Sequence, residues 1–200
     1  MSDSPPPLPS GLVAFVKRDC PTCETVAPVL GQLAEVGALT IYSQDDPGFP
    51  KGLAVEDDTE LESSWRHGID TVPTLLRVEA GKEKERAVGW DREAWERLAA
   101  AKDLGPGLPD FRPGCGSLSV DPQNALDLAV RFGSDSLKAR RVRYAPLEDE
   151  MEAAFERGWT DGLPVVPPTE RRVFAMLQGT SRAPDEVVAV VPPDLVECSV

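Results

Sequence analysis

The fold is decided by the segment LVAFVKRDCPTC, residues 12–23, in which an apolar run leads into two cysteines three positions apart. The apolar run is typical of a buried strand, and a helical pattern begins at Cys23. Two thiols at this spacing close a small disulfide ring only where the backbone turns, and a strand that runs into a helix provides such a turn. Helix amides and the helix dipole would stabilise a thiolate on Cys20. The segment therefore predicts a redox-active pair, Cys20 and Cys23.

A zinc site is the other interpretation of this cysteine pair. Zinc would need two further ligands at a matching spacing. Cys115 and Cys198 are isolated in the sequence, and His67 is the only histidine. We therefore expect neither a metal nor a cofactor, and a metal held by Cys20, Cys23 and Cys115 stays as an alternative.

Strand and helix patterns alternate through the first hundred residues, which is typical of an α/β domain. The patterns predict strands over residues 12–17, 39–43, 74–79 and 85–88, the last two as an antiparallel hairpin. They predict helices over residues 23–35, 61–67 and 92–102, with Asp91 as the cap of the last one. The acidic stretch 44–60 is broken by prolines and glycines and is expected to be a loop. The predicted domain covers residues 11–103 and follows a disordered N-terminus over residues 1–10.

A proline stands at the entrance to one of these strands, in Val72-Pro73-Thr74, about fifty residues after the cysteine pair. With this proline, residues 11–102 resemble the thioredoxin-like family. In that family a strand leads to a CxxC motif at a helix start, and a cis-proline lies against the disulfide. The two cysteines match the dithiol, Pro73 matches the cis-proline, and Gly89 matches a glycine late in the last strand. The resemblance implies a thioredoxin-like fold, with a central mixed sheet flanked by helices.

The resemblance and the chemistry of thiols together assign roles to these residues. Cys20, expected to be the more exposed thiol, would attack a substrate and form a mixed disulfide, and Cys23 would resolve it. As the resemblance implies, Pro73 would lie beside the dithiol and keep metal out of it. The residue before this proline would offer its backbone to an extended substrate. The expected substrate groove is formed by Val72, Thr74, Pro21 and Thr22.

Two positions depart from the family pattern. Asp19 stands where an aromatic residue commonly precedes the dithiol, and Ala14 stands where a buried acid is often found. These departures favour a specialised relative, so the predicted function is a thiol–disulfide oxidoreductase for a protein or low-molecular-weight disulfide or thiol. The alternative is a non-catalytic adaptor that holds a partner in the groove beside Pro73.

A third cysteine, Cys115, lies between glycines in the Gly/Pro-rich stretch over residues 104–120. This stretch is interpreted as a linker or as an irregular segment that wraps the domain. In such a loop the sulfur would be accessible, so Cys115 is a candidate third redox thiol that exchanges with Cys20. A free cysteine without a role is the other interpretation. Cys198 is interpreted as incidental.

Residues 121–200 are expected to form a mostly helical or irregular C-terminal region, either incomplete or docked on the first domain. The patterns predict a helix over residues 122–132, a second that starts at Pro146 and includes Leu147, and a third capped by Thr169. An apolar strand is expected over residues 187–191. Because it has no polar face, it is predicted to be buried on both sides.

The segment WTDGLPVVPPTERRV, residues 159–173, and the later Pro192-Pro193 stand out in this region. Through them, residues 158–200 resemble the opening of the UGSC-motif (seleno)protein family. The naming motif itself is not intact, since Cys115-Gly116-Ser117 is followed by Leu118. This resemblance implies no chemistry for the segment.

Composition limits the partners of this chain. Of its 200 residues, 41% are apolar and 28% are charged, and the formal net charge is -13. This acidity argues against a nucleic acid or an anionic membrane as partner. The first residues contain four prolines and no apolar block, unlike a signal peptide or a membrane anchor. We therefore expect a cytoplasmic protein whose four cysteines are not a structural disulfide framework.

Overall fold

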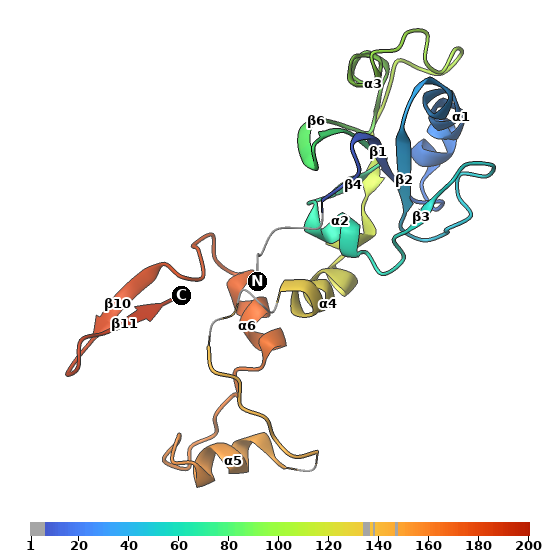
Figure 1. Ribbon diagram of the computed structural model, residues 1–200. Coiled ribbons are helices and arrows are strands. Elements are labelled where there is room, and N and C mark those ends of the chain that lie inside the picture. The colour runs from blue at the N-terminus through green and yellow to red at the C-terminus, as the bar shows by residue number, and fades with distance from the viewer. Residues whose placement is uncertain (1–6, 134–136, 138, 147) are drawn as a thin grey trace. The chain divides into compact units, whose positions relative to one another are not determined.

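The computed structural model describes residues 7–133, 137, 139–146 and 148–200. The chain divides into two compact units, Met1–Leu128 and Ala129–Val200, each coloured along the chain in Figure 1. Within the described ranges, no helix combines the length and the apolar character needed to cross a membrane.

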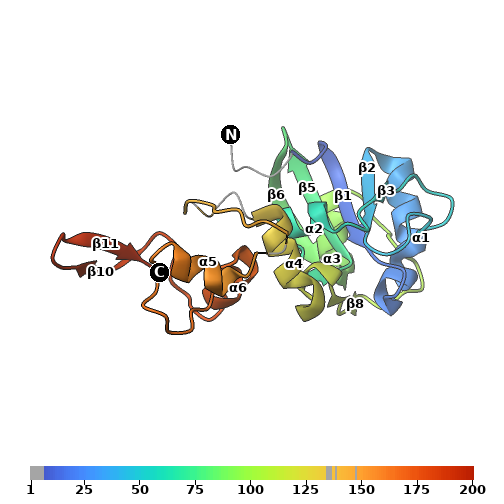
Figure 2. The same ribbon diagram turned by 90° about the horizontal axis from the view of Figure 1, so that it is seen from below.

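A five-stranded mixed sheet forms the centre of the first unit, with the strand order β3-β2-β1-β5-β6 that Figure 2 displays side by side. The strands are β1 (Gly11–Val16), β2 (Leu39–Ser43), β3 (Glu56–Asp57), β5 (Thr74–Glu79) and β6 (Lys82–Val88). β1 runs parallel to β2 and antiparallel to β5, and β5 and β6 form the expected hairpin. Because β1 is central and covered on both faces, all but its first residue are buried, which explains its unbroken apolar run.

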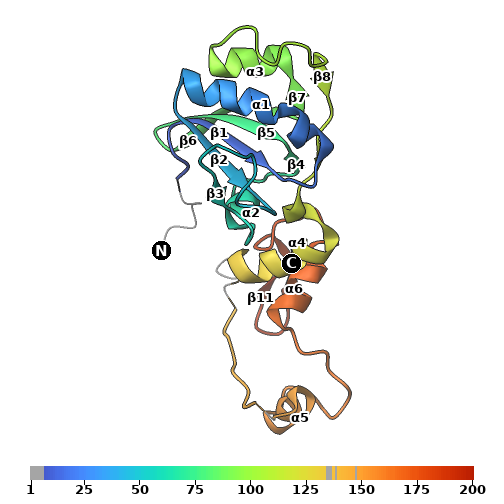
Figure 3. The ribbon, with the colours of Figure 1, turned by 90° about the vertical axis from the view of Figure 1, so that its right-hand side faces the viewer.

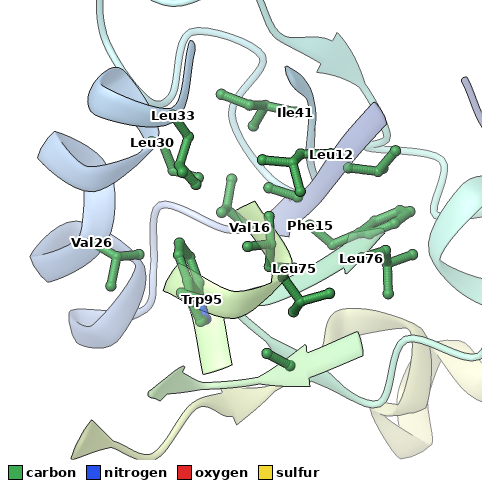
Figure 4. Packing of buried hydrophobic residues seen from close by; sticks show 14 of the residues in the cluster. Leu12, Phe15, Val16, Val26, Leu30, Leu33, Ile41, Leu75, Leu76 and Trp95 are labelled. Carbon is green, nitrogen blue, oxygen red and sulfur yellow. The ribbon is translucent and has the colours of Figure 1, made fainter. Parts of the chain in front are cut away.

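Three helices cover the sheet: α1 (Pro21–Val36), α2 (Glu62–Arg66) and α3 (Arg92–Ala99). α1 and α3 lie on one side of the sheet and α2 lies on the other (Figure 3). Val26, Leu30 and Leu33 recur at helical spacing on α1 and are fully buried, and Figure 4 places them above the strands near Trp95. The predicted α/β architecture with a central mixed sheet is therefore confirmed.

Some boundaries differ from the prediction. α3 ends at Ala99 rather than at residue 102, because Ala100 adopts a left-handed backbone with φ of 52°. Asp91 caps this helix as expected, since its Oδ1 accepts a hydrogen bond from the Ala94 amide at 3.0 Å. β6 begins at Lys82, three residues before the predicted start, and the short strand β3 lies in a stretch predicted to be a loop.

The predicted disordered N-terminus covers residues 1–10, of which residues 1–6 lie outside the described residues. Leu8 is buried with the hydrophobic core, with 5% of its surface exposed. The Ser10 hydroxyl accepts a hydrogen bond from the Ala80 amide at 3.1 Å. Packing against the sheet therefore begins before Gly11.

Residues 104–120, here called the strap, belong to the first unit and lie against the rest of it. The strap contains β8 (Phe111–Arg112), β9 (Cys115–Gly116) and the 3-10 turn η1 (Leu118–Val120). β8 pairs with β7 (Trp90–Asp91), and β9 pairs with β4 (Thr71–Val72). In Figure 3 the strap runs, in yellow-green, from the end of α3 past the first turn of α1. Of the two interpretations of this stretch, the wrapping segment describes the structure.

The described residues of the second unit form two helices and a hairpin. They are α5 (Glu150–Glu156), α6 (Glu170–Leu177), and β10 (Val187–Val191) paired with β11 (Val196–Ser199), whereas α4 (Pro122–Gly133) spans the boundary of the two units. Thr169 caps α6 as predicted. The predicted helix start at Pro146 is wrong, because Asp149 accepts the amide hydrogen bonds of the first turn of α5. Leu147 lies outside the described residues.

The strand over residues 187–191 has the predicted position but not the predicted burial. All five of its residues are exposed in β10, and its partner β11 was not expected. The apolar composition correctly indicated a strand. It gave no sign that pairing with β11 would satisfy the backbone hydrogen bonds of β10 while its side chains stay exposed.

Candidate functional site

The first helix begins directly at the cysteine pair. Cys20 is the N-cap of α1 with an extended backbone, and its Sγ accepts the Cys23 amide hydrogen at 3.3 Å. Pro21 follows as the first helical residue, where the lack of an amide hydrogen is tolerated. Cys23 lies one turn further on the inner, fully buried side of the helix. The local sequence thus places both sulfurs at the N-terminus of α1.

A carboxylate fixes the turn between β1 and α1. The two oxygens of Asp45 accept hydrogen bonds from the amides of Arg18 at 2.7 Å and Asp19 at 2.9 Å. The Arg18 guanidinium donates to Asp46 at 2.8 Å. Both anchors come from the loop after β2, which therefore holds the turn that presents Cys20.

The segment around Pro73 lies beside Cys20. The Cys20 sulfur lies 3.5 Å from the Val72 carbonyl oxygen, to which it donates a hydrogen bond when the thiol is protonated. The Val72–Pro73 peptide bond is cis, and the Pro73 carbonyl accepts the Gly89 amide hydrogen at 2.8 Å. The Thr74 hydroxyl donates a hydrogen bond to the Thr71 carbonyl at 2.7 Å.

Cys115 joins the other two cysteines. It pairs directly with Val72 in the antiparallel ladder of β4 and β9. Because the Val72 carbonyl oxygen also lies 3.5 Å from the Cys20 sulfur, this pairing places Cys115 beside Cys20. All four cysteines are free thiols, and the fourth, Cys198, is exposed in the second unit. Three of the four cysteines therefore form one cluster at the start of α1.

This cluster is covered rather than open. Only 1% of the Cys20 surface and none of the Cys23 surface is exposed, so both thiols are buried and the expected difference in exposure between them is slight. The strap causes this burial: the Thr22 hydroxyl, predicted to line a substrate groove, donates to the Pro113 carbonyl at 2.7 Å. Cys115, predicted to be accessible in a loop, lies half-buried in β9.

Hydrogen bonds between the thiols determine which of them ionises. The largest effect on the pKa of Cys20 comes from the Cys23 thiol, whose hydrogen bond lowers it, whereas burial raises it. Hydrogen bonds from the Cys115 thiol and from the amides of Cys23 and Thr22 lower it further, and the pKa of Cys20 falls to about 5. Burial raises the pKa of Cys23 and that of Cys115, and their hydrogen bonds to Cys20 raise both further. Cys20 is therefore the thiolate of the cluster at neutral pH.

A titration of thiolate absorbance in the ultraviolet tests this assignment without requiring access to the buried sulfur. In the reduced protein, one thiolate is expected to appear near pH 5 and to be missing in Cys20→Ser. Because folding lowers this pKa from 9.0, the ionised thiol stabilises the fold fully above pH 9, and this stabilisation is lost as the pH falls through 5. If every thiolate appeared only near the ordinary value, the assignment would be wrong.

Further side chains, not singled out by the sequence, hold the strap over the cluster. The Lys17 ammonium donates to the Gly116 carbonyl at 2.9 Å, and the Arg112 guanidinium donates to the Thr25 hydroxyl at 2.6 Å. The Arg92 guanidinium donates to three carbonyls of the strap, those of Leu104, Gly105 and Leu108. These contacts cannot be predicted from the spacing of the residues in the sequence, because each contact joins segments that only the fold brings together.

A buried polar network anchors the far end of the strap. The Gln44 amide donates to the hydroxyls of Ser64 at 2.7 Å and Ser117 at 2.6 Å, and its oxygen accepts the Leu118 amide hydrogen at 3.1 Å. The Ser119 hydroxyl donates to the Ile69 carbonyl at 2.7 Å. Since buried polar groups are costly unless paired, this network stabilises one position of the strap.

Within the described residues, no group of three or more His, Cys, Asp or Glu side chains is arranged to hold a metal ion. A surface cavity of about 590 Å³ lies beside α1 and is lined by Arg18, Phe49, Lys51 and their neighbours. No cysteine lines this cavity, so it does not give access to the cluster.

Comparison of the chain with models of known protein families and with curated proteins gave no match. The site is therefore interpreted from its own chemistry.

Proposed function

We propose that this protein is a thiol–disulfide oxidoreductase in which Cys20 is the nucleophile and Cys23 is the resolving thiol. The observation that carries the proposal is the position of the Cys20 sulfur as the N-cap of α1, where it accepts the Cys23 amide hydrogen at 3.3 Å. Donors at this position favour a thiolate, which is the reactive form of cysteine.

The proposed reaction transfers two electrons from the dithiol to a disulfide. The Cys20 thiolate attacks one sulfur of the substrate, the substrate S–S bond breaks, and the released thiolate takes up a proton. Once Cys20 is in the mixed disulfide, its negative charge no longer raises the pKa of Cys23. Cys23 then loses its proton and attacks Cys20, which releases the second substrate thiol and leaves a Cys20–Cys23 disulfide.

We also propose that residues 11–102 form a thioredoxin-like domain. The order of elements supports this assignment, because a central strand leads to the CxxC motif at a helix start and an antiparallel hairpin follows Pro73. The position of the Val72 carbonyl, 3.5 Å from the Cys20 sulfur, supports it as well. Its substrates would be protein or low-molecular-weight disulfides, and the reduced state of the thiols would fit the cytoplasm.

An adaptor without catalytic activity is the second candidate, and the near-complete burial of Cys20 favours it. In that case the groove beside Pro73 would hold a partner, and the dithiol would be structural. The two candidates differ in whether the thiols exchange electrons.

Mass spectrometry of the Cys115→Ser variant tests the proposal, since this variant leaves Cys20 and Cys23 as the only two cysteines at the start of α1. Oxidised glutathione is expected to remove two hydrogens from the peptide that contains both cysteines, and dithiothreitol is expected to restore them. Cys198→Ser in the same background is the matched control and should behave identically, because Cys198 is exposed in the second unit. Two thiols that stay free in the oxidant would overturn the proposal and favour the adaptor.

A further inference from the structure

We propose that β9 occupies the position of an extended substrate beside Cys20, and that Cys115 is an internal redox partner that forms a disulfide with Cys20. The inference rests on the proposed function of Cys20 as a nucleophile. It adds a third redox-active residue and an occupant of the groove, which belongs to the same chain.

The register of β9 supports this position. Cys115 stands directly opposite Val72, and the carbonyl of Val72 contacts the Cys20 sulfur at 3.5 Å. Extended peptides commonly bind by adding a strand to exposed backbone, which contributes hydrogen bonds independent of side chains. In this chain the backbone of Val72 already has such a strand, and the residue of that strand directly opposite Val72 is Cys115.

Contacts on both sides of Cys115 fix it in place. On one side, the Pro113 carbonyl accepts the Thr22 hydroxyl at 2.7 Å. On the other side, the Gly116 carbonyl accepts the Lys17 ammonium at 2.9 Å. The next amide, that of Ser117, donates to the Asp70 carbonyl at 3.0 Å. The sulfur of Cys115 is therefore held next to Cys20 rather than brought there by chance encounters.

A glycine makes this close approach possible. A Cβ on Gly114 would lie against Thr71 Cγ2 and 2.6 Å from the Val72 carbonyl oxygen, so no side chain fits there. Gly89 lies on the other side, where a Cβ would come within 2.9 Å of the Gly114 nitrogen. The backbone of the strap thus fits tightly between Val72 and Gly89.

The reaction between these residues is an exchange that needs no further oxidant. It starts from the Cys20–Cys23 disulfide, which forms when the dithiol reduces a substrate disulfide. The Cys115 thiolate attacks the Cys20 sulfur, the Cys20–Cys23 bond breaks, and a Cys20–Cys115 bond forms. Cys23 leaves as a thiolate and takes up the proton that Cys115 has lost, so the number of electrons in the protein does not change.

The test uses the full chain with Cys23→Ser, in which the resolving thiol is absent. Oxidised glutathione should first form a mixed disulfide with Cys20, and Cys115 should then displace the glutathione. Because the two sulfurs are held together, loss of glutathione from Cys20 is expected to be at least ~100-fold faster than in the double variant Cys23→Ser/Cys115→Ser. Peptide mapping should then locate a Cys20–Cys115 disulfide within one chain.

The outcomes separate this inference from the proposed function. A glutathione adduct that persists on Cys20 while Cys115 stays free would overturn the inference and leave the proposed function intact. An adduct on Cys115 alone, or a disulfide between two chains, would also overturn the inference. If Cys20 does not react in this variant and the Cys115→Ser variant forms no Cys20–Cys23 disulfide, both proposals fail.

Discussion

Replacing Cys20 with serine is expected to lower the turnover of a disulfide substrate by more than about a thousandfold. The hydroxyl of serine stays protonated at neutral pH, whereas the Cys20 thiol has a pKa lowered to about 5 by the hydrogen bonds around it. Without a thiolate at this position no mixed disulfide forms, and Cys23 has no bond to resolve. The rate of glutathione release from oxidised glutathione, with dithiothreitol as the electron donor, measures the effect.

The neighbouring variant Cys23→Ser serves as the comparison. It keeps the nucleophile, so we expect a rapid attack and a mixed disulfide at Cys20, which Cys115 then displaces. When Cys115→Ser is added, the mixed disulfide at Cys20 should persist. Cys198→Ser should keep the activity of the unmodified protein, since its sulfur is exposed and belongs to the second unit. Turnover by Cys20→Ser close to that of the unmodified protein would assign the chemistry to another residue.

The second large effect is expected from Gly114→Ala. The new methyl group would collide with Thr71 Cγ2 and with the Val72 carbonyl, both of which belong to the packed strand β4. Such overpacking costs about 1–3 kcal/mol, which we expect to appear as a lower free energy of unfolding in urea. The same collision should favour the state in which β9 is separated from β4. A cost of about 1.4 kcal/mol would raise the population of this open state tenfold. Alkylation of Cys20 by iodoacetamide should accelerate accordingly.

Gly116→Ala is the matched control for this prediction. Gly116 lies in β9, two residues after Gly114, but a Cβ there would meet no atom within 4 Å. We expect its free energy of unfolding to change by less than about 0.5 kcal/mol, with unchanged alkylation of Cys20. Equal effects of the two substitutions would show that the fit of Gly114 against Val72 does not hold the strap in place.

The sequence carried enough information to predict the sheet, its covering helices and the position of the cysteine pair. Strand β1 is recognisable because it is buried on both faces and contains no polar residue before Lys17. The cap of α3 follows from Asp91, a residue type whose side chain accepts amide hydrogens. These are local signals, and each is contained in about ten consecutive residues.

The covering of the site could not be predicted, because it depends on contacts between distant segments. The pairing of Val72 with Cys115 joins two-residue strands, which are too short to have a periodic pattern. The Gln44 side chain gave no signal either, although it joins the loop after β2 to the strap. For the same reason the burial of Cys20 was not expected: the strap, rather than the residues near Cys20 in sequence, excludes solvent from it.

The network around Gln44 has a consequence for the response of the protein to ionic strength. The groups that it contributes to the end of the strap are an uncharged amide and hydroxyls, and Gln44, Ser117 and Ser119 are all buried. Added salt screens exposed charges but has little effect on buried neutral dipoles. The exposed pairs of Arg18 with Asp46 and of Arg97 with Glu85 should therefore weaken in concentrated salt, while this end of the strap stays attached. Access to the three thiols would then depend on packing and on hydrogen bonds rather than on the ionic composition of the surroundings.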